Sequence, residues 1–543
     1  NDITAQLDHL STRARKLDLD HLIFRLDRTS IKGLTATVIQ VAALPVAENN
    51  LPAETENDDD STSALTLDLG RFLLENAVID YRDSVGALYT RLEAGRLDWK
   101  PGLLVPDKNL YDLGNLELAN TRAAVRMGKQ TVQQTAAPAA QAEMDTLVST
   151  AMKLLLKEVE LTNVTLQYDD DNEVRQQQSF DYAHINTSID KLQLADFIMN
   201  ADSLAGYIKK AVLKDHSGFS LAALQGRFLY SGRKAAITDL YLKTGNGTEL
   251  QRRVELSYPS LTSLTDNPAP LTMNLQIEKS SVRVADVLYF VPSLKEQPAF
   301  ANANDTWFMD GNINGRLDNL TISKLEVKGL SQTSAKLSGR LKGLPDADKL
   351  TADLTIDNMV TTGTDLSRIL PANSIPASVA LPAQMRLHGK INGSMKNVAT
   401  TLDLQTSAGD ISLSGTASSL TDARAAAYDM QVKTRSLQLG KIMKDTSMMG
   451  GLTAQLKIKG MGYDPQYARA NMDGIVDAMT LNGYTYRQVA LTGSLDRQVA
   501  TATAAIADSN IDFSSKIEFD MAGSQPSLRA NIAVDSIKLQ ALH

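Results

Sequence analysis

The stretch NIDFSSKIEFDMAGSQPSLRANIAVD, residues 510–535, alternates apolar and polar side chains on both sides of a central turn. Ile511, Phe513, Ile517 and Phe519 occupy odd positions, with polar residues between them, and apolar residues resume at even positions after the turn. Successive side chains of a strand point to opposite faces, so this pattern predicts a β-hairpin with one apolar and one polar face. The function depends on what the apolar face contacts.

The same alternation recurs along most of the chain. Examples are TLDLG (66–70), LQGRFLYSG (224–232), DISLSGTA (410–417) and LTAQLKIKG (452–460). Each is followed within a few residues by Gly, Asn-Gly or Asp-rich turn residues, which is typical of sequential antiparallel hairpins. The sequence therefore predicts a mainly β protein.

A few segments have apolar residues at helical spacing instead. Amphipathic helices are expected over 138–159 and 194–215, and shorter ones near 284–294, 364–371 and 438–445. Their apolar stripes are expected to pack on the β face, and contact with a membrane or a partner is the alternative.

Composition divides the chain further. Residues 45–64 and 128–143 are predicted to be mobile loops, and the proline-rich segment 370–384 an extended connector. We expect a β region at 1–127 and a segment of loop, helices and repeated β unit at 128–215. Two β segments are expected to follow, at 216–370 and 371–543.

A phrase of ten residues is repeated. LENAVIDYRD (74–83) and LTNVTLQYDD (161–170) share Leu-x-Asn and a Tyr followed two residues later by Asp, and Leu-x-Asn returns at 118–120. Such self-similarity predicts growth of one continuous sheet by accretion of a supersecondary unit.

The sequence shows no pattern typical of catalysis. There are no cysteines, and the six histidines lack metal-site spacing. A net charge of −8 gives no basic footprint for nucleic acid. Phosphate loops and nucleophile elbows are absent, and the acidic segment 168–180 lacks the Gly and Glu of a calcium loop. We therefore expect no enzyme activity, cofactor or metal, although carboxylates could still meet across strands, as in a glycosidase.

The apolar faces are rich in Leu, Ile, Val, Ala and Met, and aromatic residues make up only 5% of the chain. Flexible aliphatic side chains suit acyl chains, whereas a sugar site would need aromatic platforms. We expect the apolar face to line a groove for lipid tails, and a face covered by the protein's own helices and curvature is the alternative. The predicted lining residues are Leu387, Ile391, Leu402, Leu404, Ile411, Leu413, Leu452, Leu456, Ile458, Ile511, Phe513, Ile517, Phe519, Leu528, Ile532 and Val534.

Several of these phrases resemble one family. The segments 74–99, 218–258, 310–329, 338–359 and 366–417 are similar to the strand phrases of the TamB/AsmA-like family of bridge-like lipid-transfer proteins, as a degenerate pattern without an invariant motif. The resemblance implies an elongated, curved antiparallel β-sheet, or β-taco, with a hydrophobic groove and a few amphipathic helices. It offers no catalytic residues.

The resemblance also implies a cellular setting. The chain would be an interior periplasmic fragment from a Gram-negative bacterium, tethered to the inner membrane by an N-terminal anchor outside this sequence. A missing C-terminal domain would dock on a TamA-type outer-membrane barrel. The expected function is carriage of phospholipid between the inner and outer membranes in support of outer-membrane biogenesis. The main alternative is a chaperone-like scaffold for outer-membrane β-barrel proteins, which would act by strand pairing.

Overall fold

The computed structural model describes residues 2–18, 23–41, 66–68, 70–84, 86–102, 104–105, 109–129, 152–176, 180–370, 375, 377–464, 466–507, 510–522, 525–538 and 540. The fold is mainly β, with predominantly antiparallel pairing and only short helices, which confirms the predicted class. In these ranges no helix has the length and apolar character needed to cross a membrane. The predicted loop at 45–64 lies outside the described residues, as does the one at 128–143 apart from its first two residues.

The chain forms two compact units, Asn1–Leu261 with Ser280–Leu294, and Thr262–Lys279 with Lys295–His543. The strands up to residue 261 are β1 (Asp2–Gln6), β2 (His9–Asp18), β3 (Ile23–Lys32), β4 (Thr35–Gln40), β5 (Thr66–Asp68), β6 (Arg71–Asp83), β7 (Leu88–Lys100), β8 (Leu104–Val105), β9 (Leu110–Asp112), β10 (Asn115–Met127), β11 (Lys153–Asp170), β12 (His184–Met199), β13 (Ser203–Asp215), β14 (Ser220–Ser231), β15 (Lys234–Thr244) and β16 (Glu249–Ser257).

Pairing in the first unit departs from simple hairpins near its N-terminus. Strands β10 and β11 pair in parallel, and β6 is parallel to both β3 and β4. Parallel neighbours need a connection long enough to return the chain to the same end, and the segments 41–65 and 128–152 supply that length. From β11 to β16 each strand pairs antiparallel with the next.

The repeated Leu-x-Asn phrase marks a bend in the strands. Asn76, Asn120 and Asn163 all have positive φ, at 52°, 49° and 54°. Asn tolerates this left-handed conformation better than most residues do. The parallel pairing of β10 and β11 places Leu118 opposite Leu161, and Asn163 Nδ2 donates to Asn120 Oδ1 at 2.7 Å. Copies of the repeat thus lie side by side within one sheet.

The two long helices expected from the sequence are wrong where the structure describes them. Residues 194–199 belong to β12, 203–215 to β13 and 153–159 to β11, while the rest of 138–159 lies outside the described residues apart from Met152. For 194–215 the reason is a set of register shifts in the pairing of β12, β13 and β14. The strand is irregular near Asp196, which has a positive φ. The apolar residues Leu194 and Phe197 on either side of it are three residues apart, which is also a spacing found on one face of a helix.

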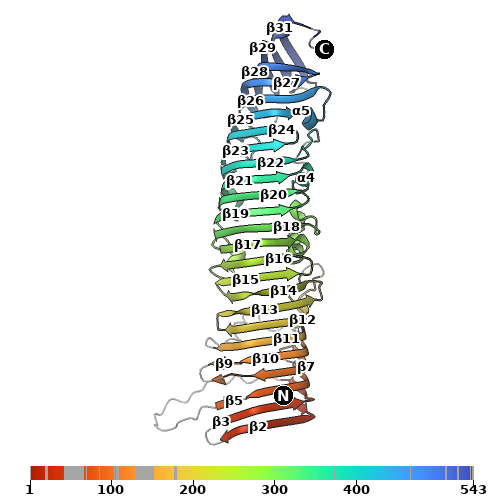
Figure 1. Ribbon diagram of the computed structural model, residues 1–543, viewed down its shortest axis with the longest axis vertical. Helices are drawn as coiled ribbons and strands as arrows, with labels where there is room; N and C mark the ends of the chain where they lie inside the picture. Colours follow the sequence, from red (N-terminus) through yellow and green to blue (C-terminus); the bar gives the residue numbers. More distant parts are fainter. Residues whose placement is uncertain are drawn as a thin grey trace, which may run out of the picture. The chain divides into compact units, whose positions relative to one another are not determined.

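The remaining strands are β17 (Thr272–Arg283), β18 (Thr306–Arg316), β19 (Asn319–Gly329), β20 (Thr333–Lys342), β21 (Thr351–Thr361), β22 (Met385–Ser394), β23 (Asn397–Thr406), β24 (Gly409–Ser418), β25 (Ala427–Gln438), β26 (Met449–Met461), β27 (Arg469–Leu481), β28 (Tyr484–Asp496), β29 (Val499–Ala507), β30 (Ile511–Asp520) and β31 (Ser527–Ile537). In the second unit β18 to β31 lie side by side in chain order, and each pairs antiparallel with the next (Figure 1).

The three short helices predicted near 284, 364 and 438 are confirmed. They are α3 (Val284–Phe290), α4 (Gly363–Ile369) and α5 (Leu439–Met443), and they follow β17, β21 and β25. The other helical segments are α2 (Ser263–Asp266), η2 (Pro292–Glu296), η3 (Pro298–Phe300) and η4 (Ala347–Lys349). The described part of the connector 370–384 contains no helix or strand.

Helices α3 and α4 are held by the same device. Asp286 of α3 accepts hydrogen bonds from Thr244 Oγ1 at 2.6 Å and Asn246 Nδ2 at 2.8 Å, in the turn between β15 and β16. Asp365 of α4 accepts from Gln332 N at 2.8 Å and Thr333 Oγ1 at 2.9 Å, beside the corresponding turn between β19 and β20. Each buried carboxylate therefore fastens its helix to a turn that lies two strands earlier.

Candidate functional site: the apolar face of strands β18 to β31

Cross-strand pairing arranges the inward positions of β18–β31 in rows that run across the strands. We label four of these rows A to D and define them on β22 and β23 by the pairs Leu387–Leu404, Gly389–Leu402, Ile391–Thr400 and Gly393–Val398. Directly opposed residues of antiparallel strands share a face, so each row continues from strand to strand through the register. Together the rows form the apolar face of the second unit.

The structure places fourteen of the sixteen predicted lining residues in these rows. Row A contains Leu387, Leu404, Ile411, Phe513 and Val534, row B Leu402, Leu413, Leu456 and Ile532, row C Ile391, Ile458 and Ile517, and row D Phe519 and Leu528.

Leu452 and Ile511, the other two predicted residues, lie beyond row A, next to the part of row A that is buried on β26–β29. Ile511 is 7% exposed and belongs to one buried cluster together with Ala454, Val476, Val489 and Ile506. Leu452 pairs with Leu437 and Met479 past the register shifts of β25–β27 and packs against the same cluster. These two residues are part of the core at the base of the face.

Most of the apolar face is neither buried nor fully exposed. Of the sixteen predicted residues only Ile511 is buried, ten are half-buried and five are exposed. Exposure is greatest on β30 and β31, where Ile517 and Phe519 are 37% exposed and Leu528 reaches 66%. The face is thus a partly covered apolar surface of the kind that soluble proteins use for binding.

The apolar face offers little to a polar ligand. None of the residues in rows A–D of β18–β31 carries a charge. Two of its hydroxyls are turned back to the main chain: Thr400 Oγ1 donates to the Lys390 carbonyl at 3.1 Å, and Thr434 Oγ1 to the Leu452 carbonyl at 3.2 Å. A ligand there meets mainly methyl and methylene groups.

The opposite face of the same strands carries the charges. Lys324 Nζ lies 3.0 Å from Asp310 Oδ1, and its hydrogen bond lowers the pKa of that carboxyl. Lys328 and Lys336 both pair with Glu326, whose pKa is lowered chiefly by the hydrogen bond from Lys328. These charged side chains find their partners on the same face of the sheet. One face is therefore charged and the other apolar.

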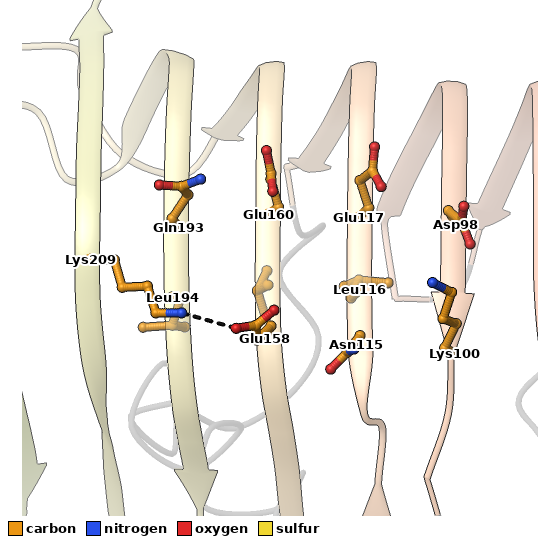
Figure 2. A pocket seen from close by; sticks show the side chains of 11 residues that line it. Asp98, Lys100, Asn115, Leu116, Glu117, Glu158, Glu160, Gln193, Leu194 and Lys209 are labelled. Carbon is orange, nitrogen blue, oxygen red and sulfur yellow. Dashed lines mark hydrogen bonds and ion pairs between the residues drawn. The ribbon is translucent and has the colours of Figure 1, made fainter.

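The concave hollows that the structure contains lie mainly on polar faces. In the first unit a hollow of about 240 Å³ lies over β7, β10, β11 and β12. Figure 2 shows its two rows of side chains, with Asp98, Glu117 and Glu160 in one and Asn115 and Glu158 in the other. The second unit has comparable furrows of about 510 and 390 Å³. Two side-chain rows of a pleated sheet produce such a furrow without any ligand.

Cations already hold carboxylates of the first-unit hollow. Lys209 Nζ donates to Glu158 Oε1 at 2.9 Å and lowers the pKa of that side chain (Figure 2). Asp98 accepts from Arg71 and Arg96, and the Arg71 hydrogen bond lowers its pKa. Over the part of the chain that the structure describes, no group of three His, Asp or Glu side chains could hold a metal ion. The ion pairs give these carboxylates of the hollow a structural role.

The chain matches none of the family models, curated proteins or solved structures with which it was compared. The family resemblance of the sequence therefore stays a prediction.

Sequence reasoning missed part of the apolar face. Its rows extend over β18–β21 and include Leu325, Leu337 and Leu354, which pair in register with the predicted residues farther along. The signal was present, because Gly-x-Ile-Asn-Gly occurs at 311–315 on β18 and again at 389–393 on β22.

Proposed function

We propose that this chain carries phospholipid along the apolar face of β18–β31, as a bridge through the periplasm between the inner and outer membranes. The observation that supports the proposal most is an uncharged aliphatic surface that continues through fourteen consecutive strands and is half-buried or exposed over most of its residues. Such a surface is far longer than a small-molecule pocket requires, and it lacks the convergent polar groups that such a pocket uses.

The mechanism follows from the chemistry of the two faces. Acyl chains lie against rows A to D, and the polar headgroup stays in water at the open side. Each methylene kept out of water contributes about 0.8 kcal/mol, so a continuous apolar surface removes the cost of exposing a whole chain between steps. A lipid meets similar side chains at every position along the rows. The rows therefore provide a path without a direction. A difference between the two ends must supply the direction.

Photo-crosslinking in living cells tests the proposal. Probes at Leu402, Leu456 and Ile517 lie on the apolar face, and Asp403, Lys457 and Glu518, each one residue farther along the same strands, are matched controls on the polar face. We expect radiolabelled phospholipid to be captured only at the first set. If folded protein captured no phospholipid at either set, the apolar face would be a core covered by the protein itself, and the proposal would be wrong.

A second candidate function, a scaffold for client β-strands, is favoured by one observation. Strand β31 pairs only with β30 among the described strands, and all of its residues are exposed. Its apolar residues Leu528, Ile532 and Val534 continue rows D, B and A to this edge. A strand without proline or inward charge can accept a further strand, from the continuation of its own chain or from a client, by main-chain hydrogen bonding. Peptide crosslinks at β31 without lipid on the apolar face would support this function.

A further inference from the structure

The apolar face repeats with a period of four strands. Leu-Ser-Gly or Leu-Thr-Gly occurs at 337–339 on β20, 413–415 on β24 and 491–493 on β28, at spacings of 415 − 339 = 76 and 493 − 415 = 78 residues. The Gly-x-Ile-Asn-Gly phrases of β18 and β22 are 389 − 311 = 78 residues apart, and α4 and α5 begin 439 − 363 = 76 residues apart.

The three glycines of this repeat fall in the same row. Register pairing runs along row C from Gly339 through Leu354, Ile391 and Thr400 to Gly415. It continues through Met430, Ile458 and Met472 to Gly493. Row C is therefore a ridge in which three side chains alternate with one glycine, here called a gap, and the flexible ends of Met430 and Met472 lie beside the gaps at Gly415 and Gly493.

The spacing of the gaps matches the size of an acyl chain. Four strands at about 4.8 Å place successive gaps about 19 Å apart across the sheet. The hydrocarbon core of a bilayer is about 30 Å thick, so one leaflet gives an acyl chain a depth of about 15 Å. A chain lying beside the ridge would thus reach from one gap nearly to the next.

We propose that the second unit binds diacyl lipids one per four-strand period, with the branch point of each lipid at a glycine of row C and one acyl chain on either side of the ridge. Two joined chains can flank a row of side chains only where that row is interrupted, and the interruptions are Gly339, Gly415 and Gly493. The inference rests on the proposed function and adds to it a fixed spacing and a stoichiometry.

Gly493 is the gap best suited to a test by substitution. The nearest atom to a Cβ at this position would be the flexible end of Met472, at 3.3 Å, and the Thr501 carbonyl oxygen would lie at 3.7 Å, an ordinary van der Waals contact; the φ of Gly493 is not in the left-handed region. Gly493→Leu therefore fills the gap with little strain on the backbone. Thr492→Leu adds a similar side chain to the exposed polar face of the same strand and is the matched control.

Native mass spectrometry of the full chain loaded with dipalmitoyl phosphatidylglycerol measures the outcome. We expect Gly493→Leu to bind one lipid fewer than the parent and Thr492→Leu to bind the same number. A second variant joins Gly339 to Thr416 and deletes the 415 − 340 + 1 = 76 residues of one period; it too should lose one lipid.

The outcomes separate this inference from the proposed function. A parent that binds no lipid would overturn both. A parent that binds lipid while folded Gly493→Leu retains the full number would overturn the fixed spacing alone, as would a folded deletion variant whose loss differs from one. Circular dichroism of each variant verifies folding before the count is made.

Discussion

At the scale of single residues, glycine allows neighbouring backbones of the second unit to approach closely. Gly389 has a φ of 145°, and a Cβ built on it would lie 2.0 Å from the Thr401 carbonyl oxygen of the neighbouring strand. Gly415 is in the same situation, with a φ of 151° and the Asp429 carbonyl oxygen at 2.1 Å. Only glycine permits this close approach of two backbones, so these positions are required by strand packing as well as by the surface of the apolar face.

Alanine substitutions distinguish a glycine that strand packing requires, such as Gly389, from one that it does not, such as Gly493. Gly389→Ala should lower the free energy of unfolding by roughly 2–3 kcal/mol, because the new methyl group meets a backbone carbonyl at an unfavourable φ. Gly493→Ala should change it by less than about 1 kcal/mol, because the unfolded chain also loses freedom. The measurement is the urea midpoint followed by circular dichroism, and equal midpoints for the two variants would contradict the distinction.

At the scale of elements, the short helices depend on buried carboxylates more than on their own helical propensity. Helix α4 has only seven residues, too few to be stable alone. Burial alone would raise the pKa of the fully buried Asp365 carboxyl, but hydrogen bonds from Gln332 N, Thr333 Oγ1 and Ser331 N together hold it below its ordinary value. The ionised carboxylate therefore stabilises the attachment of α4 to the turn.

The lowered pKa of Asp365 predicts a pH dependence for this attachment. A carboxyl with a lower pKa in the folded chain contributes stability that is complete above its unfolded value of about 3.9 and is lost as pH falls through the folded value. At pH 7 Asp365→Asn should cost roughly 1–3 kcal/mol. The difference from the parent should narrow on acidification below about pH 4.

Hydrogen exchange of the peptides containing Ser331–Thr333 and α4, at pH 7 and under acid conditions, measures the effect of Asp365→Asn. Asp353→Asn, which alters an exposed carboxyl on β21, is the control and should leave the hydrogen exchange of these peptides unchanged at both pH values. An Asp365→Asn difference that stays constant across this pH range would show that the charge has no part in the attachment.

At the scale of the whole molecule, the distinction between a groove and a closed core can be tested by placing a charge on the apolar face. Ile517 is 37% exposed on row C, whereas Leu456 packs against the buried cluster around Val476. Ile517→Asp should therefore leave thermal unfolding nearly unchanged and abolish phospholipid capture by a probe at Phe519, which is next along the strand on the same face. Leu456→Asp should also lower stability.

A matched control is Lys516→Asp on the exposed polar face of β30, which should leave lipid capture intact. Global unfolding of Ile517→Asp would mean that this part of the face is a closed core. Normal capture in a folded Ile517→Asp protein would mean that lipid does not pass over row C.

The sequence by itself determined the mainly β class, the two faces of each strand, the short helices and fourteen of the sixteen residues placed in the rows. These properties are local, because alternation with a period of two depends only on successive residues. The tertiary structure decided the rest. Strand pairing with register shifts near Asp196 replaced the helix predicted over 194–215, parallel pairing brought Asn120 beside Asn163, and pairing in register aligned Gly339, Gly415 and Gly493 in one row. Partners of this kind lie on different strands, so their alignment is fixed by backbone pairing between strands, which the pattern within a single strand does not contain.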